Sequence, residues 1–128
     1  MEIQASRNKP YIKLDKGNCT LTMKGKSYPE HPIIFFKPIF DEVNNCLPHM
    51  EGTIITINLA LEIMNSVSSK YLYVLIKDIN DVAKKVNINW YYEEDDEDMK
   101  EEGKIFQSVF QSIDLNLISI EDINNLNF

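Results

Sequence analysis

The chain has 128 residues, 44% of them hydrophobic, and a formal net charge of -7. This length and hydrophobic content suit one folded domain with its own core, and they exclude a disordered chain. The negative charge argues against binding to nucleic acid, because affinity for a phosphate backbone comes mainly from Lys and Arg. We therefore expect protein partners.

The chain carries no recognisable targeting or membrane segment. Its first residues lack the apolar centre of a secretory signal, and no apolar run approaches the roughly 20 residues that cross a bilayer. Cys19 and Cys46 are far apart in sequence and lack CxxC spacing, which indicates free thiols in a reducing compartment rather than a zinc site. We expect a cytoplasmic protein with no bound metal and no cofactor.

The first elements in the chain are predicted to be two strands that form a hairpin. Residues 11–14 and 19–24 have strand character and are joined by a turn at 15–18, where Gly17 can adopt a positive φ. In the second strand Leu21 and Met23 alternate with polar residues, as a half-buried strand requires. Residues 25–32 contain too much Pro and Gly for regular structure and form a loop.

A helix, a strand, a second helix and a further strand follow. The first helix is indicated by apolar residues at steps of three and four from Phe35 to Leu47, with Pro38 either in its first turn or kinking it. Residues 53–59 are dense in Ile and Thr and are typical of a strand buried on both faces. Residues 69–86 predict a long amphipathic helix, and residues 86–92 predict another strand.

The last part of the chain is predicted to add a third helix and a final strand. A helix over residues 99–112 is weakened by Gly103, by about 1 kcal/mol relative to Ala. Its expected inward residues are Ile105, Phe106, Val109, Phe110 and Ile113. Residues 115–120 form a short strand, and the tail at 121–128 is expected to fray. The alternation predicts parallel pairing with the hairpin at one edge, in a single α/β domain spanning 1–128 with its core at about 10–120.

No catalytic constellation can be assembled from the sequence. His31 and His49 are the only histidines, both are next to Pro, and each is interpreted as a loop residue rather than a general base. The glycine patterns that bind phosphates or dinucleotides are absent. We expect a protein that is not an enzyme, and the sign of an unfamiliar enzyme would be a deep pocket that holds a titrating His.

The acidic run at residues 93–98 offers an alternative function. Its carboxylates could make a module that binds a divalent metal or a small molecule, although the spacing is not that of an EF-hand. We favour a structural role, because Asp95 to Asp98 fall at the start of the third helix, where carboxylates cap free N–H groups and oppose the helix dipole.

Three serines lie where an apolar strand gives way to the second helix. Backbone N–H groups are unpaired at a helix start and the dipole is positive there, so a phosphate on Ser66 would meet favourable electrostatics. The alternative is structural, with one of Ser66, Ser68 and Ser69 serving as the N-cap. These residue types alone do not separate a cap from a phosphorylation site.

Three segments resemble the SiaC-like regulatory phosphoproteins of bacteria. They are Ser27–Glu30, Leu61–Lys70 and Trp90–Met99, in this order and spacing, and the resemblance runs from about residue 10 to residue 120. The most specific parts are Ser-Tyr-Pro-Glu and Asn-Ser-x-Ser-x-Lys. His31 and Val67 depart from the common pattern, and Ser66 replaces the threonine of the best-known member.

The resemblance implies a fold and a mode of regulation. The fold is an α/β domain similar to anti-sigma-factor antagonists, which is a STAS-like architecture with a mixed sheet, an N-terminal hairpin and about three helices. Ser66 is implied as the residue that a kinase phosphorylates and a phosphatase restores. The unmodified form is implied to bind and activate a diguanylate cyclase, so that the output is cyclic di-GMP signalling.

We therefore predict a docking surface around Ser66 that a partner occupies only when the hydroxyl is unmodified. The surface combines the turn after the second predicted strand with the loop that opens the second helix. Its predicted members are Tyr28, Pro29, Glu30, Asn65, Ser68, Ser69 and Lys70.

Overall fold

Six strands form one mixed sheet in the computed structural model, which describes residues 1–128. The strands are β1 (Glu2–Ile3), β2 (Tyr11–Asp15), β3 (Thr20–Ser27), β4 (Ile54–Met64), β5 (Lys85–Glu93) and β6 (Asp114–Ile120). They lie in the sheet in sequence order, with β1, β2 and β3 antiparallel and β3 to β6 parallel. The predicted parallel sheet with a hairpin at its edge is thus confirmed.

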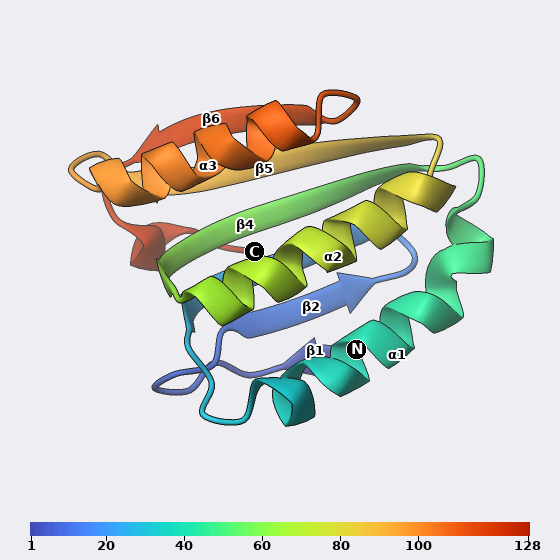
Figure 1. The fold of residues 1–128 in the computed structure, drawn as a ribbon, viewed down its shortest axis with the longest axis horizontal. Helices are drawn as coiled ribbons and strands as arrows, with labels where there is room; N and C mark the ends of the chain where they lie inside the picture. The colour runs from blue at the N-terminus through green and yellow to red at the C-terminus, as the bar shows by residue number, and fades with distance from the viewer.

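Three helices cover one face of this sheet and begin at the same end of it, on the left in Figure 1. They are α1 (Pro32–Met50), α2 (Ser66–Val82) and α3 (Glu97–Val109), and a short 3-10 helix, η1 (Ile123–Asn125), follows β6. Each α-helix follows a strand of the parallel part of the sheet and leads to the next strand. This alternation brings the three helix starts to one edge.

The helix boundaries differ from the sequence expectations. For Pro38 the sequence left two alternatives open, and because α1 starts at Pro32 the residue lies inside the helix and not in its first turn. His49 lies in the last turn of α1, so its interpretation as a loop residue was wrong. Helix α2 begins at Ser66, three residues earlier than predicted, and ends at Val82.

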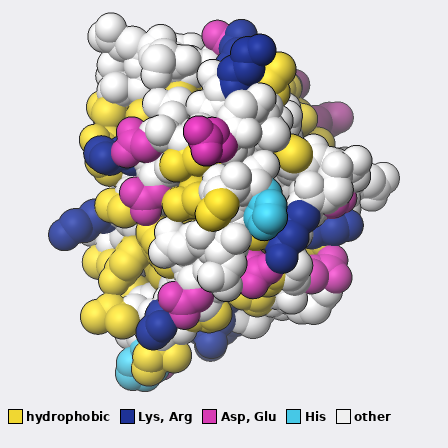
Figure 2. Space-filling view, turned by 90° about the vertical axis from the view of Figure 1, so that its right-hand side faces the viewer, with side chains coloured by type: hydrophobic (Ala, Val, Ile, Leu, Met, Phe, Trp, Pro, Cys, Tyr) yellow, Lys and Arg dark blue, Asp and Glu magenta, His cyan; other side chains and the backbone are white.

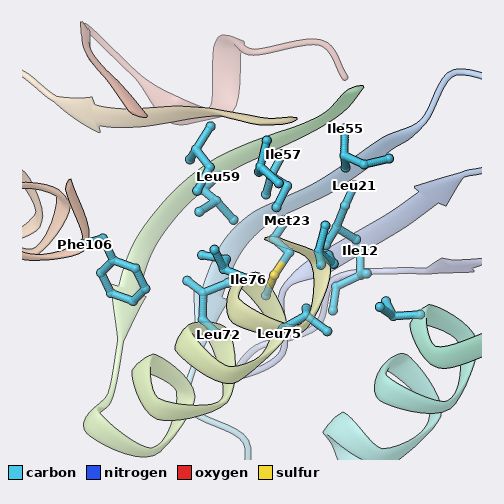
Figure 3. Close-up of a cluster of buried hydrophobic side chains, with 14 of the residues drawn as sticks. Ile12, Leu21, Met23, Ile55, Ile57, Leu59, Leu72, Leu75, Ile76 and Phe106 are labelled. Atoms are coloured by element: carbon cyan, nitrogen blue, oxygen red, sulfur yellow. The ribbon is translucent and has the colours of Figure 1, made fainter. Parts of the chain in front are cut away.

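The core lies between the sheet and the helices. Figure 3 shows the side chains of β3 and β4, among them Leu21, Met23 and Ile57, pointing toward the apolar stripe of α2. Leu72, Leu75 and Ile76 form that stripe and are at most 1% exposed. The alternation of Leu21 and Met23 in β3 faces the core as predicted. The position of α2 is therefore determined by apolar packing along most of its length.

The other face of the sheet is mainly polar, so the prediction that the strand at 53–59 is buried on both faces was wrong. Along β4, buried Ile55, Ile57 and Leu59 alternate with more exposed residues. Asn58 on the polar face accepts a hydrogen bond from Asn89 of β5 at 2.9 Å. The helices cover one face only, so this strand needed apolar residues at alternate positions only.

The C-terminal tail lies against this second face. The ring of Phe128 packs edge-on against Tyr91 with centroids 5.6 Å apart. Lys24 donates a hydrogen bond to the carbonyl oxygen of Leu126 at 2.7 Å. Ile123 is buried, and its N–H donates to Glu93. The tail that was expected to fray is therefore packed at these points.

Gly103 lets α3 approach the sheet closely. A Cβ atom at this position would lie 2.8 Å from the Trp90 ring and 2.5 Å from Leu117. Trp90 is buried and donates from Nε1 to the carbonyl oxygen of Met99 at 3.1 Å. Ile105 and Val109 are exposed, so their predicted inward position was wrong. The inward stripe instead contains Met99, Gly103, Phe106 and Phe110.

The β2–β3 turn also differs from its prediction. The residue with a positive φ is Cys19, at 51°, and not Gly17. The backbone of Cys19 is held in place because its carbonyl oxygen accepts a hydrogen bond from the N–H of Thr56 at 3.0 Å. The left-handed conformation is uncommon for a residue with a side chain, so this turn carries local strain.

Candidate functional site

The carboxyl ends of β3, β4 and β5 meet at one edge of the sheet, on the left in Figure 1. The segments that follow these strands are residues 28–31, Asn65 and residues 94–96, and each leads into a helix. The carboxyl edge of parallel strands is where α/β proteins usually place their functional residues. The three segments that carried the family resemblance therefore belong to one region of the molecule.

Asn65 is the N-cap of α2. Its side-chain oxygen accepts a hydrogen bond from the N–H of Ser68 at 2.9 Å, and its backbone is extended. The expectation that one of the three serines caps the helix was wrong. Asn is as good a cap as Ser, and β4 continues to Met64, so the residue between strand and helix is Asn65.

The three serines have different environments. Ser68 is buried, and its hydroxyl accepts a hydrogen bond from that of Ser27 at 2.8 Å. The Ser69 hydroxyl is half-buried and donates to a carboxylate oxygen of Glu102 at 2.8 Å. Ser66 is exposed at the first helical position, and its hydroxyl makes no hydrogen bond within the chain. Ser66 is the one serine of the three whose hydroxyl is free for an enzyme to reach.

The turn after β3 is attached to the same region through its backbone. The N–H of Asn65 donates to the carbonyl oxygen of Ser27 at 3.1 Å, and the N–H of Tyr28 donates to Asn8 at 2.9 Å. Together with the buried contact between Ser27 and Ser68, these bonds fix the turn beside the start of α2.

The predicted docking residues differ in how exposed they are. Glu30, Asn65 and Lys70 are exposed, whereas Tyr28 and Ser69 are half-buried. Pro29 and Ser68 are buried, so their side chains present little surface to a partner. Five of the seven predicted residues are therefore at least partly exposed.

Two exposed apolar side chains close to Ser66 in the chain were missed. Ile63, near the end of β4, is 47% exposed, and Val67, in the first turn of α2, is 41% exposed. Val67 falls outside the apolar stripe of α2. An apolar residue outside that stripe was the signal in the sequence that could have indicated its exposure. The two residues give the region an exposed apolar component.

The electrostatics at the start of α2 favour an added anion. The first turn of α2 contains no acidic residue, and helix geometry leaves the N–H groups of Ser66 and Val67 without carbonyl partners in the helix. Lys70 is one turn further along the same side of the helix, is exposed and forms no ion pair. A phosphate on Ser66 would therefore meet free N–H groups, the positive end of the dipole and one cation.

The acidic run performs the capping role that was predicted for it. Asp96 is the N-cap of α3 and accepts from the N–H of Met99 at 3.0 Å, and Glu97 and Asp98 lie in the first helical turn. No group of three or more His, Cys, Asp or Glu side chains is arranged to hold a metal ion.

The model of the SiaC family of regulatory phosphoproteins matches residues 3–120. The chain belongs to this family. The match confirms the family that the three sequence segments indicated, and the matched range includes all three segments. No curated protein matches the chain. No helix has the length and apolar character needed to cross a membrane.

Solved structures of this family have the same fold. One is a chain in the crystal structure of the diguanylate cyclase SiaD in complex with its activator SiaC from Pseudomonas aeruginosa. The TM-score is 0.84 and the identity 22%, over 94% of this chain and 99% of that one. The apo-SiaC structure from the same organism gives a TM-score of 0.78 at 23% identity, over 92% and 97% of the two chains. A third SiaC structure from this organism gives 0.80 at 21%, over 94% and 98%.

Proposed function

We propose that this chain is a non-enzymatic switch that binds and activates a diguanylate cyclase when Ser66 is unmodified, and that a kinase and a phosphatase set the state of Ser66. The observation that carries the proposal is the difference among the three serines. Only the Ser66 hydroxyl is exposed and free of hydrogen bonds, and it lies in a helical turn without acidic residues.

The docking surface that we propose surrounds this hydroxyl. Its polar part consists of Glu30, Asn65 and Lys70, with Tyr28 and Ser69 at its margin. Val67 and Ile63 supply exposed apolar area that becomes buried when a partner docks. An uncharged hydroxyl among such groups is compatible with a desolvated interface.

Phosphorylation would oppose docking without unfolding the domain. A phosphoserine adds about -1.5 to -2 charges and a strongly hydrated group, which is costly to bury in an interface. Within the domain the same group is accommodated by the free N–H groups at the start of α2 and by Lys70. The modification therefore changes binding while the fold is retained.

The same geometry argues against modification of the neighbouring serines. A phosphate on Ser68 would have to replace the buried hydrogen bond to Ser27. A phosphate on Ser69 would face the carboxylate of Glu102, which now accepts a hydrogen bond from that hydroxyl at 2.8 Å. Both changes are unfavourable, one because of burial and the other because of like-charge repulsion.

The experiment compares Ser66→Ala and Ser66→Glu in titrations against the diguanylate cyclases of the source organism, with affinity and cyclic di-GMP synthesis as the measurements. We expect Ser66→Ala to bind and activate like the unmodified chain. Ser66→Glu should bind at least about tenfold more weakly, a loss of about 1.4 kcal/mol.

A matched control adds the same charge elsewhere. Ser108→Glu on the exposed face of α3 should leave binding unchanged, because Ser108 lies outside the proposed surface. Mass spectrometry of the chain after incubation with a cognate kinase should place the phosphate on Ser66. Equal binding by Ser66→Ala and Ser66→Glu, or a phosphate on another serine, would remove Ser66 from the switch.

A further inference from the structure

Strand β6 forms one edge of the sheet and pairs with β5 alone. It is the outermost strand at the top of Figure 1 and is seven residues long, whereas β1 at the opposite edge has two residues. Proteins usually protect an exposed edge strand with Lys, Pro, a bulge or a short length. Strand β6 contains no Lys, Arg, Pro or Gly, and its register with β5 continues without a bulge. Nothing in the strand itself therefore prevents another strand from pairing with it.

The strand also carries no unpaired charge. Asp114 is its one charged residue and forms an ion pair with Lys85 at 2.7 Å. Figure 2 looks from the side at which β6 begins, and the top of the molecule in this view consists mostly of uncharged polar side chains and backbone, with basic and acidic side chains beside one another. The net charge of -7 is therefore located away from the strand.

Two hydrogen bonds identify the backbone groups of β6 that point away from β5. In a parallel pair, alternate residues of a strand direct both their N–H and their C=O to the same neighbour. The carbonyl oxygen of Ile120 accepts from the N–H of Glu94, just after β5, at 2.9 Å, so the even-numbered residues face β5. The carbonyl oxygen of Leu115 accepts from the Gln107 side chain at 3.0 Å on the other side. Leu117 and Ser119 are then left with a free N–H and a free C=O each.

We propose that β6 pairs antiparallel with β6 of a second copy of this chain, around a two-fold axis at Ile118. This register places Leu117 of each copy opposite Ser119 of the other, and each such pair exchanges two N–H to C=O hydrogen bonds. All the free groups of Leu117 and Ser119 are then satisfied, and Leu115 keeps its bond to Gln107. The edge is complementary to itself, as a two-fold interface requires.

The face of α3 that lies beside this edge carries charges of both signs. Glu97, Lys100, Lys104 and Gln107 follow one another at helical spacing, and Gln107 reaches β6. The two-fold axis reverses the direction of this face in the second copy, so the acidic start of one α3 lies beside the lysines of the other. The ion pair of Lys104 with Glu101 is exposed and weak enough to open for such a contact. This charge complementarity favours a second copy over an unrelated strand.

The proposal is independent of the Ser66 switch, and its first test is the mass of the full chain by analytical ultracentrifugation over a concentration series. We expect the mass to rise toward that of two chains. Ser119→Pro should abolish the rise, because it removes one donor from each copy and so two of the four hydrogen bonds, whereas the monomer does not use this N–H. Ser119→Thr retains the N–H and should dimerise like the wild type. A wild-type chain that stays monomeric up to millimolar concentration, or equal dimerisation by Ser119→Pro, would overturn the proposal.

A cross-linking experiment tests the register and does not depend on the folding of Ser119→Pro. At the proposed axis the Cα atoms of the two Ile118 residues are about 4.5 Å apart, which a disulfide can span. Ile118→Cys should therefore give a covalent dimer under mild oxidation, with the wild type as control for Cys19 and Cys46.

The matched control for the register is Asn116→Cys, on the same face of β6. In the proposed dimer its two copies are four residues apart along the strands, or about 13 Å, and should not cross-link. Cross-linking of Asn116→Cys as fast as that of Ile118→Cys, or of neither variant, would overturn the proposed pairing.

Discussion

Helices α2 and α3 begin in the same way but carry different charges. Asn65 caps α2 by accepting from the N–H of Ser68 at 2.9 Å, and Asp96 caps α3 by accepting from the N–H of Met99 at 3.0 Å. The first turn of α3 contains Glu97 and Asp98, whereas the first turn of α2 contains no acidic residue. The negative charge that α3 carries permanently is thus absent from α2.

Under the proposed switch, the start of α3 is structural and the start of its neighbour α2 is regulatory. Carboxylates at the start of α3 stabilise it at all times, because they oppose the helix dipole in every state of the protein. At the start of α2 the proposed switch would add the equivalent charge to Ser66 and remove it again. Both helices begin with the same capping geometry, which tolerates a negative charge. The charge at the start of α3 is permanent, whereas the charge proposed for α2 is not.

The largest expected effect concerns the anchoring of α3. Gly103→Ala should lower the free energy of unfolding by about 1–3 kcal/mol, because the added methyl group would collide with Trp90 and Leu117 in a packed core. Urea unfolding followed by circular dichroism measures this change, with the exposed Lys104→Ala as control. If Gly103 acts only through helix propensity, the substitution would instead stabilise the protein by about 1 kcal/mol.

The caps should show the next largest effect. Asn65→Ala and Asp96→Ala should each lower the free energy of unfolding by about 1 kcal/mol through the lost cap, and Asp96→Ala should lower it further because it also removes a charge from the dipole. Asp96→Asn separates the two contributions, since it retains an acceptor without the charge. A loss from Asp96→Asn as large as that from Asp96→Ala would mean that charge alone accounts for the stabilisation.

The smallest expected effect is the response of α2 to a new charge. Ser66→Asp should raise the free energy of unfolding by about 0.3–1 kcal/mol at low salt, and the gain should shrink in 1 M salt, where the screening length is about 3 Å. Ser69→Asp should give no gain, because it adds its charge beside Glu102. Thermal unfolding at two salt concentrations measures both variants, and an equal response of the two would contradict the proposed difference between the serines.

Much of the fold follows from local sequence patterns. The alternation of Leu21 and Met23 predicted which face of β3 meets the core, and the stripe that includes Leu72, Leu75 and Ile76 predicted α2. Such patterns are readable because each depends on residues only two to four positions apart. The succession of strands and helices then predicted the parallel sheet with the hairpin at its edge.

The remaining features depend on contacts between distant parts of the chain. The inward stripe of α3 includes Gly103, which the local sequence shows only as a residue that weakens a helix. Its role in packing depends on the ring of Trp90, which lies against it. The burial of Ser68 depends on Ser27, 41 residues earlier.

The buried hydroxyl pair of Ser27 and Ser68 limits how any enzyme can approach Ser66. A catalytic cleft that accepts its target as an extended peptide would have to pull Ser68 out of the protein and unwind the first turn of α2. An enzyme that modifies the native domain must therefore recognise a shape assembled from several loops. A synthetic peptide copied from residues 61–70 would be a poor substitute for the whole protein as a substrate.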